Sequence, residues 1–133
     1  MDDVIESFLK ISQEIPKAKL SLAVRIKNRK DAQKKKEISS KLKKRHLLKQ
    51  VVFHDNGQYD MADIYNLADI SVFPARNMRG KFDVPLAVIE AMACEKPVII
   101  SNLPILQEFV NNKNSVIINP GDVSQLSREI LKL

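Results

Sequence analysis

Glu90 is the most conspicuous polar residue of the sequence, because it stands in an otherwise apolar segment that predicts a helix over residues 85–94. A helix that is apolar around its whole circumference is normally buried. A carboxylate on such a helix costs free energy unless it faces a polar site or a partner. Two interpretations of Glu90 stay open. It either binds a ligand, or it lies on a narrow stripe that faces solvent.

The loop over residues 75–83 that precedes this helix is polar and basic, and it carries Arg76, Arg79, Lys81 and the carboxylate Asp83. Pro85 suits a first helical turn, where its missing N–H costs nothing. The remaining N–H groups of a first turn have no partners within the helix and can receive a phosphate. The loop and the helix start therefore predict an anion site, with solvated loop cations as the alternative.

The elements that would position these residues alternate along the chain. Strands are expected over residues 20–26, 51–53, 70–74, 97–101 and 115–118, and helices over 2–13, 31–48, 60–68, 85–94, 104–111 and from Asp122, a natural N-cap. This alternation predicts an α/β fold, with a parallel sheet of about five strands and helices on both faces. The segment PVIIS has no polar alternation, which indicates a strand buried on both faces.

Such sheets bind ligands outside the carboxyl ends of their strands. Those ends are the segments after residues 26, 54, 74 and 101. His54 closes one strand at this edge. It is a candidate contact for a ligand, or a lone structural or solvated histidine.

Length and composition limit the class of protein. With 133 residues, 44% of them hydrophobic, the chain suits one globular domain. No apolar run approaches the roughly 20 residues that span a bilayer. The acidic start lacks the pattern of a secretory signal, and the single Cys94 fits a reducing cytosol, so we expect a cytoplasmic protein. Too few Cys and His are present for a structural zinc site, and no metal is expected.

The net charge of +6 is concentrated in one segment. Residues 27–49 contain eleven of the 22 Lys and Arg and only two carboxylates, Asp31 and Glu37. A lysine-rich helix face is usually solvated. It could also touch anionic lipid, and we expect at most peripheral contact with the inner face of the membrane. Nucleic-acid binding is disfavoured because the segment has no aromatic residue on which bases could stack.

The segment PLAVIEAMACEKPVIIS resembles one shared by family 4 (group 1) glycosyltransferases of the GT-B fold. VVFHDNGQYDMADIYNLADISVFPAR and NSVIINPGDVSQLSREI are similar to the family's other segments, in its order. The resemblance covers almost the whole chain. It implies most of the carboxyl-terminal donor-binding domain, a Rossmann-like half of a GT-B fold whose first strand is missing and whose amino-terminal acceptor domain is absent.

By this resemblance the chain serves a retaining transferase of hexosyltransferase type in polysaccharide biosynthesis. Its donor is a nucleotide-diphosphate-sugar, and no cofactor or obligatory metal is needed. Glu90 matches the family's second glutamate, which holds the ribose hydroxyls. Main-chain N–H groups near Val84, Pro85 and Leu86 match contacts to the sugar and phosphates. The loop around His54 lies near the base, and Arg76, Arg79 and Lys81 are candidates for the phosphates or the acceptor.

The sequence departs from the family at the first glutamate, where it has Phe82. Asp83 is adjacent but one residue out of register, and it is the candidate catalytic carboxylate in that glutamate's place. A Glu95 replaces the family's usual glycine, which we interpret as surface variation. We expect the chain alone to be inactive as a transferase. The alternative is a catalytically incomplete module that binds a nucleotide or a protein.

Overall fold

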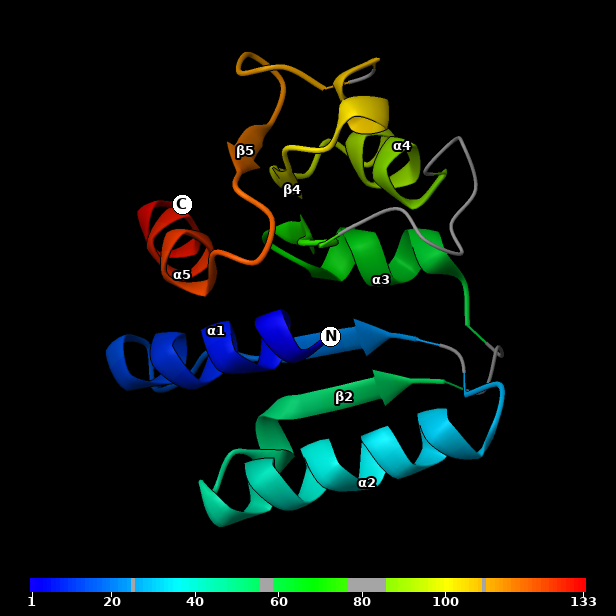
Figure 1. Cartoon of the computed structure of the whole chain (residues 1–133), viewed down its shortest axis with the longest axis vertical. Helices are drawn as coiled ribbons and strands as arrows, with labels where there is room; N and C mark the ends of the chain where they lie inside the picture. Colours follow the sequence, from blue (N-terminus) through cyan, green and yellow to red (C-terminus); the bar gives the residue numbers. More distant parts are fainter. Residues whose placement is uncertain (25, 56–58, 77–85, 109) are drawn as a thin grey trace.

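The computed structural model describes residues 1–24, 26–55, 59–76, 86–108 and 110–133, in which helices and strands alternate (Figure 1). The helices are α1 (Asp2–Glu14), α2 (Arg29–Lys44), α3 (Met61–Leu67), α4 (Leu86–Ala93) and α5 (Val123–Lys132). The strands are β1 (Leu20–Ala23), β2 (Val51–His54), β3 (Ser71–Phe73), β4 (Val98–Ser101) and β5 (Val116–Ile118). Two 3-10 helices are η1 (Leu48–Gln50) and η2 (Pro104–Glu108), the latter where an α-helix was predicted. The predicted order of the elements is confirmed.

Side-chain caps fix where three helices begin. Asn28 accepts a hydrogen bond from the N–H of Asp31 at 2.9 Å, so α2 starts two residues before the predicted bound. Asp60 caps α3 and Asp122 caps α5 in the same way. The predicted N-cap at Asp122 is confirmed. Each cap satisfies an N–H group that has no partner within its helix.

The helix of the basic segment ends earlier than predicted, at Lys44, because the chain turns left-handed just after it. His46 has φ of 59°, and its N–H and that of Leu47 bond back to the carbonyls of Lys43 and Leu42. This pair of bonds is a Schellman motif, which stops an α-helix. His46 is therefore the helix terminator and not a residue of the helix surface.

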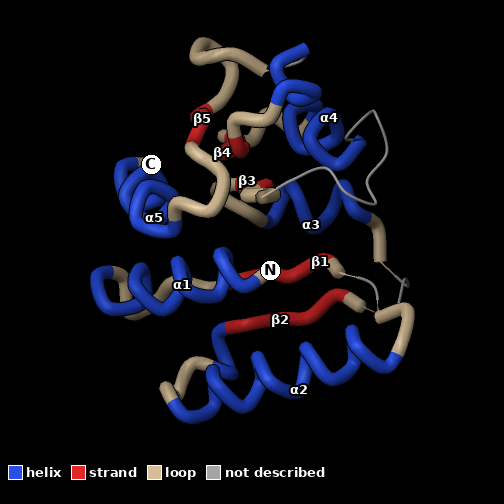
Figure 2. The backbone as a smooth tube through the Cα atoms, in the orientation of Figure 1, coloured by secondary structure: helices blue, strands red, loops and turns tan. Residues whose placement is uncertain are grey.

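All strand pairs are parallel, but the five strands form two sheets. β1 pairs with β2, and β3, β4 and β5 pair in that order. Across the molecule they follow one another as β2, β1, β3, β4, β5 (Figure 2). Among the described residues no strand lies between β1 and β3. The parallel α/β prediction is confirmed, and the expected single sheet is divided into two.

Helices cover both faces of the strands. Ile5, Phe8 and Leu9 of α1 pack with Ile38 and Leu42 of α2 on the β1–β2 pair. In the other sheet β4 is buried at every residue, as predicted. Its Val98 and Ile100 face α3 and α4, and its Ile99 faces α5. α1 lies along α5, so α1, α2 and α5 share one layer while α3 and α4 form the other.

The chain builds the two sheets outward in opposite directions, starting from β1 in one sheet and from β3 in the other. Crossovers between parallel strands are right-handed, so helices on opposite faces carry the chain in opposite directions across a sheet. α2 carries the chain from β1 outward to β2, and α4 carries it from β3 outward to β4. A reversal of this kind is a topological switch point, the place where open α/β sheets bind ligands.

Candidate functional site

Glu90 lies on the outward side of α4. Val88 and Ala91 are buried against β4, but Leu86 is 65% exposed, Ile89 is 41% exposed, and Glu90 is also exposed. The prediction that this helix is buried on nearly every face is wrong. α4 is an outer-layer helix that needs one buried stripe only, and its exposed apolar residues are Leu86, Ala87, Ile89 and Ala93. The Glu90 carboxylate consequently does not suffer the desolvation cost expected from the sequence.

Tyr65 of α3 is the titratable neighbour of Glu90. Burial raises the pKa of the Tyr65 phenol, and the nearby charge of Glu90 raises it further. Among the described residues no hydrogen bond or ion pair engages the Glu90 carboxylate. Its oxygens therefore remain available to accept hydrogen bonds from a ligand.

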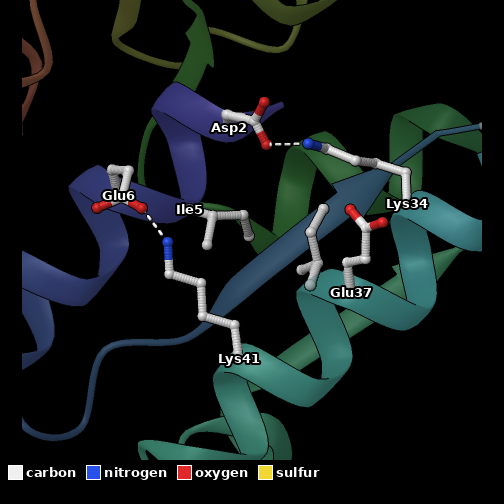
Figure 3. A pocket seen from close by; sticks show the side chains of 7 residues that line it. Asp2, Ile5, Glu6, Lys34, Glu37 and Lys41 are labelled. Carbon is white, nitrogen blue, oxygen red and sulfur yellow. Dashed lines mark hydrogen bonds and ion pairs between the residues drawn. The ribbon is translucent and has the colours of Figure 1, made fainter.

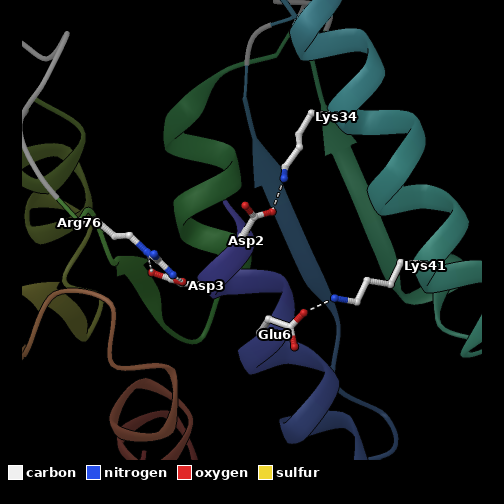
Figure 4. Close-up of polar contacts among 6 residues, drawn as sticks. All are labelled: Asp2, Asp3, Glu6, Lys34, Lys41 and Arg76. Atoms are coloured by element: carbon white, nitrogen blue, oxygen red, sulfur yellow. Dashed lines mark hydrogen bonds and ion pairs between the residues drawn. The ribbon is translucent and has the colours of Figure 1, made fainter.

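Arg76, just after β3, is held by Asp3 in the first turn of α1. Its Nε and Nη2 donate to the two Asp3 oxygens at 3.0 and 2.6 Å (Figure 4). The Asp3 side chain is 7% exposed, while that of Arg76 is 66% exposed. The hydrogen bond from Arg76 holds the pKa of the Asp3 carboxyl below its usual value, despite burial that opposes the shift. Arg76 is thus a bridge between α1 and β3 that still turns part of its guanidinium to solvent.

Two further residues, Ser101 and Gly121, lie at or just after the carboxyl ends of β4 and β5. Gly121 has φ of 78°, and a Cβ built there would lie 3.8 Å from Nε of Arg76, so the turn after β5 passes close to the arginine. Ser101 ends β4 and is 1% exposed, and its Oγ has no hydrogen-bond partner among the residues that the structure describes. A buried hydroxyl without a partner is uncommon.

His54 ends β2 at the same edge but belongs to a separate group of side chains. Its ring meets that of Tyr59 edge-to-face at 5.3 Å, and the Tyr59 hydroxyl donates to its carbonyl oxygen. The next residue, Asp55, is paired with Lys35, whose Nζ lies 5.0 Å from the centre of the Phe53 ring. No contact among the described residues joins His54 to Arg76 or Glu90. His54 and Arg76 lie at the carboxyl ends of strands and Glu90 lies on α4, and the three do not form one cluster.

Several predicted site residues lie outside the described part of the chain. They are Arg79, Lys81, Phe82, Asp83, Val84 and Pro85. Of the predicted phosphate-binding segment, Leu86 is described, and it begins α4 with its side chain exposed.

A cavity lies between α1 and α2. This cavity of about 200 Å³ has Ile5 and Ile38 as its apolar lining (Figure 3). Ion pairs from Asp2 to Lys34, at 2.6 Å, and from Glu6 to Lys41 bridge the two helices beside it. These pairs fasten α1 to α2, so we assign the cavity no catalytic part.

A family model described as glycosyl transferases group 1 matches residues 1–133. The chain belongs to the group 1 glycosyltransferases. A search of curated proteins finds no match. A role in glycosyl transfer is therefore established at the level of the family, and the α/β fold with parallel strands agrees with it. No described helix is long and apolar enough to cross a bilayer.

Asp3, Tyr65 and Ser101 of this glycosyltransferase domain were not among the residues predicted from the sequence. Asp3 gave a weak signal as an acid in the first turn of a helix, and Ser101 as the polar end of an apolar strand. Tyr65 was inside a segment similar to the family but was not singled out. The contacts of Asp3 and Tyr65 depend on neighbours far along the chain, and the burial of Ser101 depends on packing, none of which composition and spacing reveal.

Proposed function

We propose that this chain is the donor-binding domain of a retaining family 4 glycosyltransferase of the GT-B fold. It binds a nucleotide-diphosphate-sugar and supports transfer of the sugar to a glycan or lipid-linked acceptor in polysaccharide biosynthesis. The observation that carries the proposal is the match of the whole chain to group 1 glycosyltransferases, combined with an exposed Glu90 that has no partner among the described residues, in the segment that resembles the family's donor site.

Glu90 is the proposed contact for the ribose hydroxyls. A carboxylate has only acceptor oxygens, which suits a pair of hydroxyl donors. Among the described residues the carboxylate has no competing hydrogen bond or ion pair. Each hydrogen bond to a charged acceptor contributes roughly 1.5–3 kcal/mol net, enough for one side chain to dominate nucleoside affinity.

The diphosphate is proposed to lie between the start of α4 and the switch point. N–H groups at the start of α4 stabilise negative charge. Arg76 contributes a guanidinium that Asp3 orients through two of its nitrogens, which leaves Nη1 for a phosphate oxygen. A fixed cation and helix-end N–H groups would stabilise the leaving diphosphate as charge develops on it.

Further roles are proposed for residues that the structure does not describe, and for a separate domain. Arg79 and Lys81 are candidates for further positive charge near the phosphates. Asp83 is the candidate to replace the family's first glutamate near the transferred sugar. The acceptor is proposed to be held by a separate amino-terminal domain, because holding both reactants in place supplies much of the catalysis in such a transfer.

Substitution of Glu90 tests the proposal. Glu90→Gln keeps the size of the side chain and one acceptor oxygen but removes the charge, so nucleoside-diphosphate binding should weaken by about tenfold or more. Titration calorimetry of the intact protein with a nucleoside diphosphate measures the change. Glu90 is exposed, so the fold should be unaffected, and the melting temperature checks this.

Glu95→Gln is the matched control. It makes the same chemical change five residues away, just beyond the same helix, at another exposed glutamate. It should leave nucleotide affinity unchanged. Equal affinities for both variants and the parent protein would refute the role of Glu90 and favour a module with a different ligand.

A further inference from the structure

The basic helix α2 carries two kinds of cation, which the structure separates by position. Three lysines on its inner flanks are paired with carboxylates. Lys34 pairs with Asp2, Lys41 with Glu6, and Lys35 with Asp55. These three fasten α2 to α1 and to the end of β2. Their charges are locally compensated by these carboxylates.

The outer face of α2 carries a second set of cations. Arg29, Lys36 and Lys43 follow one another at intervals of seven residues, which is about two helical turns, so they form one row about 21 Å long. Lys44 stands beside the end of this row. All four are exposed, and among the described residues none has an ion-pair partner.

Little negative charge lies near this row. The two carboxylates of α2 are Asp31 and Glu37. Asp31 accepts a hydrogen bond from the N–H of Lys27 at 2.9 Å, as part of the helix start. Glu37 stands on the flank of the helix, and its neighbours in the shallow hollow of about 440 Å³ on the outer side include Lys36, Lys41 and Lys44. The row therefore presents a net positive surface.

α2 lies at the outside of the molecule, with its other side against β1 and β2 (Figure 1). No other described element covers its outer face, so a flat partner can approach the whole row at once. This geometry suits a surface broader than the helix itself.

We propose that the row Arg29, Lys36, Lys43 and Lys44 docks the protein on an anionic lipid bilayer. Lipid headgroups diffuse laterally, so they adapt to any spacing of cations along a helix. A bilayer needs no aromatic side chains for stacking, and α2 has none, whereas single-stranded nucleic acid is held largely by stacking. The proposal does not depend on the proposed function. With α2 flat on the bilayer, the strands run along the membrane plane.

Vesicle sedimentation of the protein tests the proposal. The probes are vesicles of phosphatidylcholine mixed in equal parts with phosphatidylglycerol, and vesicles of phosphatidylcholine alone. We expect binding to the mixed vesicles at low salt, its loss at high salt, and no binding to the neutral ones. Binding to both kinds alike would overturn the proposal.

Two triple variants with the same change in charge show which side of α2 binds the vesicles. Replacing the outer Lys36, Lys43 and Lys44 by alanine should weaken vesicle binding by about 100-fold at low salt, because each basic residue contributes about fivefold. Replacing the inner Lys34, Lys35 and Lys41 by alanine should leave most of the binding. Replacing the same three outer lysines by arginine keeps the charge and should retain binding. This variant shows that substitution at these positions does not itself disturb the fold. Equal losses in the two alanine triples would refute the outer row.

A nucleic-acid duplex at the same salt is the remaining probe. If the protein binds the duplex more tightly than the mixed vesicles, and the outer alanine triple abolishes that binding, the row is a nucleic-acid surface and the lipid proposal is wrong.

Discussion

Glu95 illustrates how a single residue can carry strain that its exposure does not suggest. It has φ of 59° just after α4, and N–H groups of Glu95 and Lys96 bond to the carbonyls of Met92 and Ala91. This is a Schellman motif with a side chain at the position that favours glycine. The interpretation of Glu95 as surface variation holds for its side chain, but its backbone is the one that the family's glycine would adopt without strain.

Glu95→Gly should therefore stabilise the protein. A left-handed non-glycine residue costs about 1–2 kcal/mol, and glycine's greater freedom in the unfolded state offsets part of the gain. We expect the free energy of unfolding to rise by roughly 0.5–1 kcal/mol, measured by urea denaturation. Glu95→Ala removes the same carboxylate but keeps a Cβ, so it should not reproduce the gain. Equal gains in the two variants would point to charge and not to the backbone.

At the scale of elements, the strands differ in how many of their edges are paired. β4 pairs on both sides and is buried at every residue. Among the described residues β1 pairs only with β2, and Ser21 and Ala23 are exposed. In a parallel ladder alternate N–H groups point to opposite edges of a strand, so half of those in β1 point toward the gap beside β3.

Hydrogen exchange should detect this difference. Amides of Ile99 and Ile100 in β4 should exchange slowest in the protein, at least about tenfold slower than those of β1. Within β1, protection should alternate from residue to residue, because one edge is bonded and the other is not. Uniform strong protection along β1 would mean that its second edge is also paired.

At the scale of the whole molecule, the helices α1 and α5 and the ion pair of Arg76 with Asp3 connect the two sheets. α1 packs on the β1–β2 pair and also lies along α5, where the hydroxyl oxygens of Ser7 and Ser127 are hydrogen-bonded at 3.0 Å. Arg76 and Asp3 connect the end of β3 to the first turn of α1. The first helix is therefore the element through which the halves of the domain contact each other.

Asp3→Asn should weaken that connection in a pH-dependent way. The pKa of Asp3 is lowered from 3.8 in the folded protein, so its contribution to stability is complete above that value and is lost as pH falls through the folded-state pKa. We expect a loss of about 1–2 kcal/mol at neutral pH that vanishes in strong acid. Urea denaturation across that range measures it. Asp2→Asn is the control, with a smaller loss because Asp2 is 65% exposed. A loss for Asp3→Asn that does not change with pH would contradict the ion pair.

Much of the fold could be predicted from the sequence because it depends on local patterns. The apolar run PVIIS predicted a strand buried on both faces, Asp122 predicted a helix start, and the alternation of elements predicted parallel strands. The positions of two candidate residues were predicted in the same way, since His54 ends β2 and Arg76 follows β3, which places both at the carboxyl edge. Periodicity and capping act between residues a few positions apart, so they can be recognised in a sequence.

The tertiary structure alone decided which of these features meet. Arg76 is held by Asp3, 73 residues away, and no local pattern links them. Glu90 is exposed because α4 lies in an outer layer, although its apolar composition suggested burial. Among the described residues, the cations of α2 divide into paired and unpaired sets because α1 and the end of β2 supply carboxylates to its inner side. Contacts of this kind depend on how the crossovers stack the helices on the sheets, and spacing along one element carries no information about that packing.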